Sequence, residues 1–320
     1  MTQPANVYSV YDASGASGVG KGNREDLVNT VYDISPTDTP ILTALPRGTA
    51  KAVFHEWTTH ALATAAANEK VEGDDATIDA ATAKTRLGNY CAISNKVAGV
   101  TKTQQAVDKV GMQDAMAEEV GYKMKEIKRD MEVMICANTA RVAGNDTTAR
   151  KSAGFPTWLK DNESRGATGA DPTGDGTNTA TDGTQRAFAE SQLLEVSQEC
   201  YDSGGSPSLL VVGTFNKRVA SGFAGNQTRQ TDADKKKLIN SVSVYEDDFN
   251  TLKIVPDRFS RSRDALLIDT EYAKIAYLRA FETWDLAVTG SSLRKQIETE
   301  WCLEVCNPAA HGVVADLTTS

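Results

Sequence analysis

The strongest helical pattern in this chain is a stripe of apolar residues that recurs at steps of three and four positions. The stripe consists of Met116, Val120, Met124, Ile127, Met131 and Met134. This spacing places the side chains on one face of an α-helix, where a methionine stripe indicates core packing more than a ligand site. We predict a helix from about Gln104 to Ala143, ended by Gly144 and Asn145, with a length of roughly 60 Å at 1.5 Å per residue.

Two runs of alternating polarity before this helix predict a long two-stranded arm. The first run begins at Lys51, and the second extends from Arg86 to Val100. One face of the first carries Val53, His55, Trp57 and Thr59, and one face of the second carries Leu87, Cys91, Ile93 and Val97. The stretch between them, Ala61 to Ala83, is rich in Ala, Asp and Thr and has too little apolar material to pack a core of its own.

A compact α+β unit is predicted after the helix. Residues 161 to 185 have no apolar periodicity and are dominated by Gly, Thr, Asp and Ala, so they are expected to form an exposed loop. The pattern then predicts helices over Ala187 to Tyr201 and Thr214 to Phe223, and strands over Ser208 to Val212, Ser243 to Pro256 with a turn at Asp247 to Asn250, Ala265 to Asp269, and Lys274 to Phe281.

The C-terminal region returns to strand character in the run QIETEWCLEV. Its predicted apolar face carries Ile297, Thr299, Trp301, Leu303 and Val305. Its other face, with Glu298, Glu300, Cys302 and Glu304, is acidic and is expected to be wet.

Composition indicates a globular protein with a sizeable core, since 40% of its 320 residues are hydrophobic. No run approaches the roughly 18 apolar residues of a membrane helix. The first residues lack the features of a signal peptide, so we expect synthesis in a cytoplasm. Residues 1 to 23 are rich in Gly, Ser, Ala and Asn and indicate a flexible arm, after which Asn23 could cap a short helix that Pro36 and Pro40 end.

The net charge and the cysteine pattern restrict the classes of function that fit this chain. The net charge of -9 and the pI near 5.0 oppose a surface that binds nucleic acid, but they suit a container wall that repels its phosphate-rich contents. The five cysteines are odd in number and scattered, which predicts free thiols. Cys302 and Cys306 would share one strand face about 13 Å apart, too far for a disulfide.

The most specific enzyme-like motif is Gly15 to Gly22, which fits GxxxxGK with its lysine at Lys21. A phosphate-binding loop needs Ser or Thr next to the lysine to bind magnesium, but this chain has Gly22 there. The run from Ala265 to Asp269 imitates an apolar strand that ends in a metal-binding Asp. A nucleotide-binding enzyme therefore remains an alternative, but the missing hydroxyl speaks against it.

Two metal-like patterns also fail on spacing. His55 and His60 are five positions apart, which puts them on opposite faces of a strand instead of on one face of a helix. Asp171, Asp175 and Asp182 lack the spacing and the closing Glu of a calcium loop, and a flexible surface loop explains them. We therefore predict no catalytic residue, no cofactor-binding residue and no metal ligand.

The predicted parts are an arm, a long hairpin, a very long helix, a compact unit and a returning strand. This set is more typical of a subunit in an assembly than of a monomer. Such projections bury their apolar faces only against other copies. Together with Glu25-Asp26-Leu27 and the segment from Ile34 to Pro40, which reads Ile-x-Pro-x-x-Thr-Pro, this order of parts resembles the tailed-phage major capsid proteins with the Hong Kong 97-type fold.

The resemblance implies an α+β capsid fold with a set of regions in a defined order. These are an N-terminal arm (1 to 50), an extended loop (51 to 104), a spine helix with the peripheral domain (105 to 160), an axial domain (161 to 283) and a strand that returns to the peripheral domain (284 to 320). It also implies a structural virion protein, assembled in the host cytoplasm into hexamers and pentamers of an icosahedral head. Further expected partners are a separate scaffolding protein, a portal and double-stranded DNA held without sequence-specific contacts, but no membrane. An encapsulin-like non-viral shell protein is the nearest alternative.

Overall fold

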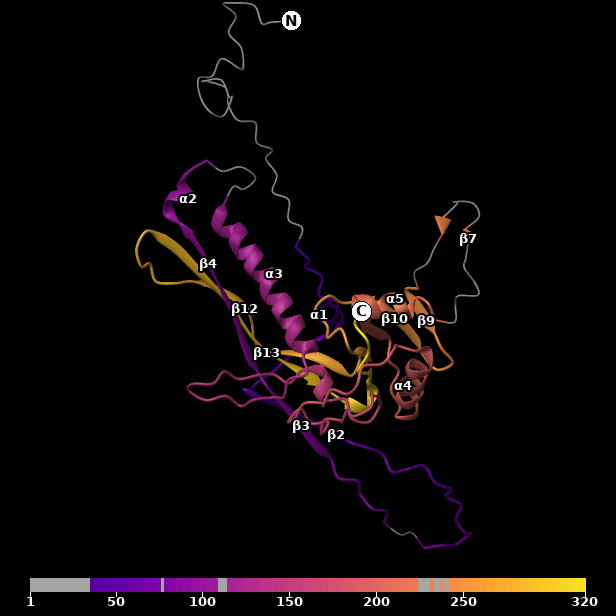
Figure 1. Cartoon of the computed structure of the whole chain (residues 1–320). Coiled ribbons are helices and arrows are strands. Elements are labelled where there is room, and N and C mark those ends of the chain that lie inside the picture. The colour runs from indigo at the N-terminus through magenta and orange to yellow at the C-terminus, as the bar shows by residue number, and fades with distance from the viewer. Residues whose placement is uncertain (1–34, 76–77, 109–113, 224–230, 233–236, 239–241) are drawn as a thin grey trace, which may run out of the picture.

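The computed structural model describes residues 35–75, 78–108, 114–223, 231–232, 237–238 and 242–320. Figure 1 shows a long sheet with one helix lying along it, a second compact unit beside the lower part of that sheet, and a hairpin that projects away from both. The predicted helix start at Asn23 and the Gly15 to Gly22 motif lie outside the described residues.

A four-stranded sheet in the order β1-β12-β13-β4 forms the long part of the molecule. Its strands are β1 (Arg47–Thr49), β4 (Ala92–Thr101), β12 (Ala273–Asp285) and β13 (Ser292–Val305). β13 pairs antiparallel with both β12 and β4, whereas β1 runs parallel to β12. The strand predicted over 274 to 281 is therefore real, but it belongs to this sheet and not to the compact unit.

Helix α3 (Ala115–Cys136) packs against β4 and β13 through the predicted apolar stripe. Met116, Ile127 and Met131 are buried, and Val120, Met124 and Met134 pack partly buried against the core that contains Ile127 and Met131. Asp114 caps the helix, because its side chain accepts hydrogen bonds from the backbone N–H groups of Met116 (2.9 Å) and Ala117 (3.2 Å).

The helix is shorter than predicted at both ends. A separate short helix, α2 (Lys102–Ala106), ends where Val107 turns to an extended conformation. Ala137 is also extended, and Gly154 packs so closely on this helix end that a Cβ there would lie 1.8 Å from the Ala137 carbonyl oxygen. Gly144 and Asn145 instead form the tip of a projecting loop closed by a bridge between Val142 and Lys151.

A six-stranded sheet in the order β5-β14-β11-β6-β10-β9 forms the centre of the compact unit. Its strands are β5 (Glu163–Ser164), β6 (Leu209–Val212), β9 (Val244–Glu246), β10 (Thr251–Pro256), β11 (Ala265–Ile268) and β14 (Gly312–Val314). Both faces are buried: alternate residues of β6 join the core under α3, and the others join a second core with helices α4 (Glu190–Asp202) and α5 (Thr214–Ala220). The C-terminal β14 thus returns to the compact unit and not to the long sheet.

Three smaller pairs of elements complete the fold. The projecting hairpin consists of β2 (Phe54–Thr59) and β3 (Thr85–Tyr90), and β7 (Thr231–Asp232) pairs with β8 (Lys237–Leu238). Two 3-10 turns, η1 (Phe155–Thr157) and η3 (Pro308–Ala310), connect the units. Residues 40 to 49 were predicted as arm, but α1 (Pro40–Ala44) buries Ile41 in the main core and β1 joins the long sheet.

The outward face of β13 is not wet as predicted. Its apolar face is buried, but Glu298 and Glu300 on the other face are also no more than 9% exposed. Arg279 forms ion pairs with both carboxylates, and Arg150 lies 2.9 Å from Glu300. Alternation correctly predicted the strand, but it could not reveal the arginines that cover its acidic face.

Candidate assembly interface

The hairpin is divided into a paired base and an unpaired distal connection. β2 and β3 pair from Phe54 opposite Tyr90 to Thr59 opposite Thr85. Every described residue from His60 to Arg86 is exposed. The predicted long arm is therefore correct for 54 to 90, but the second predicted strand breaks at Cys91, after which β4 enters the four-stranded sheet.

The base of the hairpin is rigidly attached to the body. Trp57 packs against Trp158, with ring centroids 5.5 Å apart. The buried Asn89 side chain donates to the Leu303 carbonyl (2.8 Å) and accepts from the Ala153 N–H (2.9 Å). His55 lies 3.1 Å from Glu304 of β13. The hairpin direction is thus fixed by contacts within this chain, whereas the described residues of its distal connection lack such contacts.

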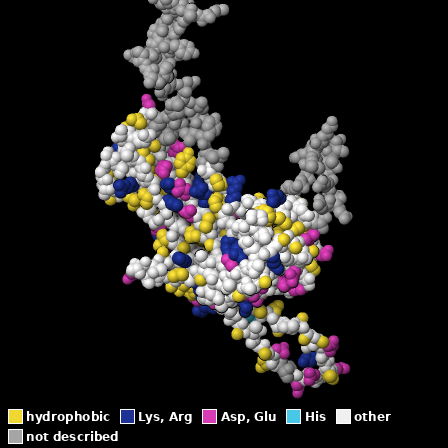
Figure 2. Space-filling model, viewed as in Figure 1, with side chains coloured by type: hydrophobic (Ala, Val, Ile, Leu, Met, Phe, Trp, Pro, Cys, Tyr) yellow, Lys and Arg dark blue, Asp and Glu magenta, His cyan; other side chains and the backbone are white. Residues whose placement is uncertain are grey.

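The distal connection carries apolar side chains that nothing in the described chain covers. Leu62 is 87%, Val71 81% and Ile78 102% exposed. The same segment contains the exposed acidic residues Glu69, Glu72, Asp74, Asp75 and Asp79. Figure 2 shows these apolar and acidic side chains together on the projection, away from the body. Large apolar side chains held this far from the core of their own chain are typical of a surface that packs on another molecule.

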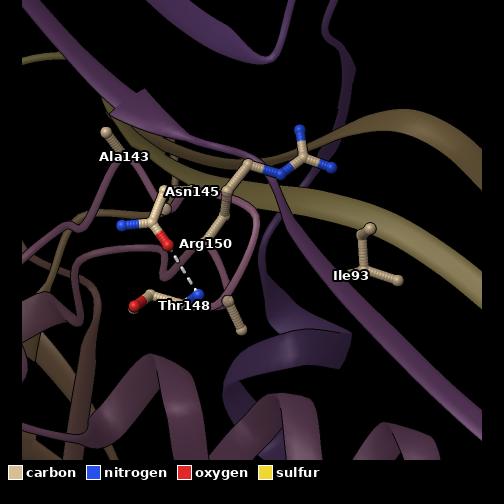
Figure 3. A pocket seen from close by; sticks show the side chains of 7 residues that line it. Ile93, Ala143, Asn145, Thr148 and Arg150 are labelled. Carbon is tan, nitrogen blue, oxygen red and sulfur yellow. Dashed lines mark hydrogen bonds between the residues drawn. The ribbon is translucent and has the colours of Figure 1, made fainter.

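The outer face of β4 is a second exposed apolar surface. Ile93 is 48% and Val97 47% exposed. The sequence predicted that they share a face with Leu87 and Cys91, but Leu87 is half-buried and Cys91 is fully buried. Because β4 is an edge strand, this face borders unpaired backbone. Beside Ile93 lies an open hollow of about 420 Å³, bounded by the loop from Ala143 to Arg150 (Figure 3). Asn145 shapes this loop by accepting from the Thr148 N–H at 2.8 Å.

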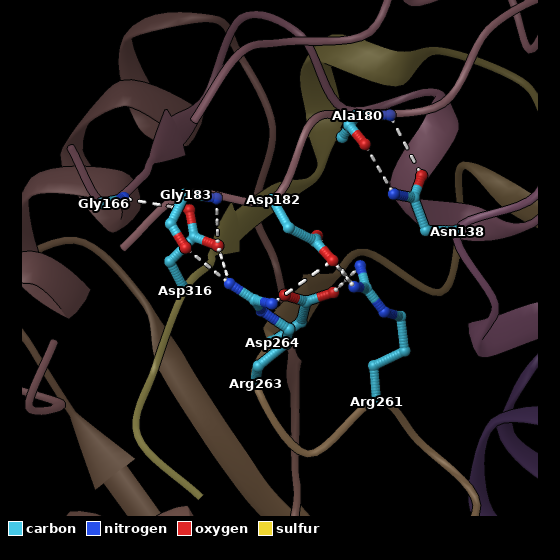
Figure 4. A network of polar contacts seen from close by, with 9 residues as sticks. All are labelled: Asn138, Gly166, Ala180, Asp182, Gly183, Arg261, Arg263, Asp264 and Asp316. Atoms are coloured by element: carbon cyan, nitrogen blue, oxygen red, sulfur yellow. Dashed lines mark hydrogen bonds and ion pairs between the residues drawn. The ribbon is translucent and has the colours of Figure 1, made fainter. Parts of the chain in front are cut away.

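Residues 161 to 185 are irregular apart from β5, but they are bound to the body, and several are buried, so the segment is not the exposed loop that was predicted. Asp182 lies 2.8 Å from Arg261 and 3.3 Å from Arg263, and Arg263 lies 2.6 Å from Asp316 (Figure 4). Burial would raise the pKa of Asp182, but the hydrogen bond and charge of Arg261 together with the charges of Arg263 and Arg165 outweigh burial, so the pKa is lowered. Asp171 likewise pairs with Arg165 at 2.7 Å. The ion pairs of these two carboxylates therefore help to hold residues 161 to 185 in place.

Asp316 is the centre of this network. It is 1% exposed, has a φ of 60°, and accepts from the backbone N–H groups of Gly166 (3.1 Å) and Gly183 (2.8 Å) as well as from Arg263. Asp316→Ala leaves two N–H groups without their acceptor and removes one of the two ion pairs of Arg263, which keeps Asp182. We expect a loss of about 3–5 kcal/mol in the free energy of unfolding, measured by denaturant titration. Asp316→Asn, which tolerates positive φ, should cost clearly less; equal stabilities of both variants with the unmodified chain would contradict this role.

Glu132 of α3 holds the N-terminus of α1. Its carboxylate accepts from the Ile41 N–H (2.7 Å) and the Leu42 N–H (2.8 Å), whereas the Thr39 side chain provides no cap. Burial is the main reason that the pKa of Glu132 is raised to about 7; the two N–H bonds act in the opposite direction, and Asp257 adds to the rise.

The raised pKa of Glu132 predicts a specific pH dependence of stability. The folded state binds the proton more tightly than the unfolded state, whose Glu has a pKa near 4.5. The stabilisation from this group is therefore complete below pH 4.5 and is lost as the pH rises through 7, a difference of about 3 kcal/mol. Glu132→Gln should remove this part of the slope between pH 4.5 and 7. Parallel stability curves for Glu132→Gln and the unmodified chain would show that Glu132 does not titrate in this window.

The enzyme-like and metal-like motifs do not meet in one site within the described residues. Asp269, at the end of β11, accepts from the N–H groups of Ser206 (3.2 Å) and Glu271 (2.9 Å) and so caps turns. His55 pairs with Glu304, whereas His60 is exposed. Across the described ranges, no group of three or more His, Cys, Asp or Glu side chains is placed to hold a metal ion.

The structure brings together two cysteines that the sequence analysis treated as unrelated. Cys91 and Cys302 are both fully buried and lie in one small cluster with Ala50 and Ala276. They are free thiols, like the other three. Only the strand register could have indicated this pairing, because the two positions are far apart in the chain.

Comparison with known proteins decides the family. The model of the family described as SU10 major capsid protein matches residues 11–318. This chain belongs to the SU10 major capsid protein family. The major capsid protein of Escherichia phage Phieco32 is 22% identical over 334 residues, covering 92% of this chain and 94% of the relative.

Solved capsid structures share the fold of this capsid protein. The capsid asymmetric unit of cyanophage A-1(L) superposes with a TM-score of 0.67 at 11% identity, covering 93% of this chain and 98% of that one. The SrpI encapsulin of Synechococcus elongatus PCC 7942 superposes with a TM-score of 0.54 at 10% identity and 94% coverage of both chains. The fold is thus the Hong Kong 97-like capsid fold expected from the sequence. Of the described helices, none combines the length and apolar character needed to cross a bilayer.

Proposed function

We propose that this major capsid protein assembles with copies of itself, as hexamers and pentamers, into the icosahedral head of a tailed phage that encloses double-stranded DNA. The observation that carries the proposal is the hairpin, whose base is fixed to the body while its distal connection exposes Leu62, Val71 and Ile78. These side chains have no cover in the described part of the chain, and a second subunit is the partner that would bury them.

Charge supports a docking site for the distal connection on α3 of a neighbouring subunit. The connection carries Glu69, Glu72, Asp74, Asp75 and Asp79, and all five are exposed. On the solvent side of α3, Lys125 and Lys128 are exposed, and Lys125 is held over the Tyr122 ring at 5.5 Å. Opposite charges of this kind set the orientation and register of two subunits more than they add affinity.

The two sheets suggest how the subunit is divided. We assign the four-stranded sheet with α3 to the peripheral domain and the six-stranded sheet with α4 and α5 to the axial domain of the capsid fold. The chain crosses between these units more often than the sequence boundaries assume, because β12 and β13 lie in the first and β14 in the second. Because the chain crosses repeatedly between the two units, we expect the subunit to behave as one rigid body.

A separate scaffolding protein and a portal are the further partners we propose. The net charge of -9 supports a wall that encloses DNA without binding it through sequence-specific contacts. The virion is the location that follows from membership in a phage capsid family. Assembly in the host cytoplasm belongs to the same proposal.

The contents of the particles separate a phage head from an encapsulin-like compartment, which shares the fold. Particles that contain this chain are isolated and treated with nuclease, and their interior is then analysed. We expect protected double-stranded DNA of one length. A protein cargo without protected DNA would overturn the phage-head assignment in favour of the compartment.

A structural role without catalysis is the last part of this proposal. Lys21 has no metal-binding hydroxyl after it in the GxxxxGK motif, so Lys21→Ala should leave thermal stability and assembly within experimental error of the unmodified chain. The measurement is ATP hydrolysis by both proteins. Hydrolysis that disappears in Lys21→Ala would contradict the non-enzymatic role.

A further inference from the structure

Cys91 and Cys302 face each other across two neighbouring strands. The register of β13 and β4 ends with Trp301 opposite Ala92, and one further step places Cys302 opposite Cys91. Both side chains are 0% exposed, and the Cys91 thiol donates to the Ala52 carbonyl at 3.6 Å. Each thiol is also the largest cause of the change in the pKa of the other, which is lowered for Cys91 and raised for Cys302.

The backbone geometry at this position suits a covalent bond between the two sulfurs. The Cys91 N–H donates to the Val53 carbonyl (2.8 Å), on the side away from β13, so Cys91 and Cys302 form a non-hydrogen-bonded pair. Directly opposite Cα atoms in such a pair are about 4.5 Å apart, which lies within the disulfide range of about 4.4–6.8 Å. Each of the other cysteines differs: Cys136 and Cys200 are buried in other clusters, and Cys306 is half-buried.

We propose that Cys91 and Cys302 are a built-in site for an intrachain disulfide, formed by a peroxide-class oxidant in the folded protein. The bond would tie the hairpin to the long sheet, because Cys91 is the residue between β3 and β4 and Cys302 lies inside β13. This inference does not depend on assembly. A disulfide that forms after synthesis does, however, suit a capsid subunit that is made in a reducing cytoplasm and is later released from the cell, because disulfides persist outside the cell.

Oxidation of this thiol pair consumes one peroxide. Contact with Cys302 lowers the pKa of Cys91 although burial acts against this, whereas contact with Cys91 and burial raise the pKa of Cys302, which favours Cys91 as the nucleophile. The Cys91 thiolate attacks hydrogen peroxide, the O–O bond breaks, and hydroxide leaves and is protonated to water, which gives a sulfenic acid. The Cys302 sulfur then attacks the Cys91 sulfur, the S–O bond breaks, and a second water leaves with the Cys302 proton. Two thiols lose two electrons in total, and one peroxide takes them up.

The test treats the folded, full-length chain with hydrogen peroxide and then blocks the remaining thiols with an alkylating reagent under denaturing conditions. We expect one crosslinked peptide that joins Cys91 to Cys302 and is two mass units lighter than the sum of its halves. Because the bond closes a loop of roughly 210 residues, the melting temperature should rise by about 5–10 °C after oxidation.

Matched variants distinguish this bond from general oxidation. Cys302→Ala should lose both the crosslink and the rise in melting temperature, whereas Cys200→Ala, which removes an equally buried thiol without a thiol neighbour, should keep both. The half-buried Cys306 reports whether the oxidant has reacted with the protein. If Cys306 is oxidised while Cys91 and Cys302 are still both alkylated, or if either joins another cysteine or chain, the proposal is wrong. Failure here leaves shell assembly untouched, and failure of assembly leaves this crosslink measurable in the isolated chain.

Discussion

Met131→Asp is expected to yield no folded protein. Met131 is 0% exposed on the inner face of α3, in the core that α3 shares with β13 and the turn η1. A carboxylate there would lie among the apolar side chains of this core, and an unpaired buried charge costs several kcal/mol, a large part of the usual 5–15 kcal/mol of domain stability. The measurement is the yield of soluble protein together with its far-ultraviolet circular dichroism.

Two controls on the same helix separate burial from charge. Met131→Leu keeps the volume apolar and should cost less than about 1.5 kcal/mol. Val133→Asp introduces the same charge two residues later, at a position that is 46% exposed, and should fold normally. Soluble, normally melting Met131→Asp protein would show that this face of α3 does not pack on a core.

Deleting Thr64 to Thr82 and bridging the gap with a short Gly-Ser linker should abolish the formation of normal shells while leaving the subunit folded. The deletion keeps the pairing of Thr59 with Thr85 and all contacts of the hairpin base, and every described residue that it removes is exposed. Melting temperature tests the fold, and sedimentation tests assembly. We expect an unchanged melting temperature for the unassembled subunit and a loss of closed particles.

A charge-only variant shows which property of the hairpin matters. Changing Glu69, Glu72, Asp74 and Asp75 to their amides keeps the length and apolar residues of the segment. If apolar cover dominates, this variant should still assemble, but with a weaker dependence of the assembly rate on salt. Closed shells of normal diameter and heat resistance from the deletion variant would mean that the hairpin is not a clasp between subunits.

The features that the sequence predicted correctly are those set by neighbouring residues. The turn from Asp247 to Asn250 between β9 and β10 has local turn chemistry, and the apolar stripe of α3 and the alternation of β13 have a clear period. The exposed connection of the hairpin was also predictable, because a segment so poor in large apolar residues cannot form its own core. These patterns and the capsid resemblance together gave the fold class.

The features that it missed depend on contacts between distant parts of the chain. The end of α3 after Cys136 lies against the distant Gly154, and the hairpin strand breaks at Cys91, where the chain switches its strand partner from β2 to β13. The attachment of residues 161 to 185 depends on Asp316, near the C-terminus. Hydrogen bonds between residues so far apart in the chain leave no periodic pattern in the sequence. Residues 161 to 185 were therefore predicted as a loose loop, although they are attached to the body.

Negative-stain electron microscopy of the purified full-length chain, compared with the Thr64 to Thr82 deletion in the same buffer, tests the central claim most directly. We expect closed shells of uniform diameter from the full-length chain, or open sheets and tubes with the same subunit packing when no scaffolding protein is present. The deletion variant should show only dispersed subunits or irregular particles. A full-length chain that stays monomeric at every concentration at which it is soluble would contradict its assignment as a shell-forming capsid subunit.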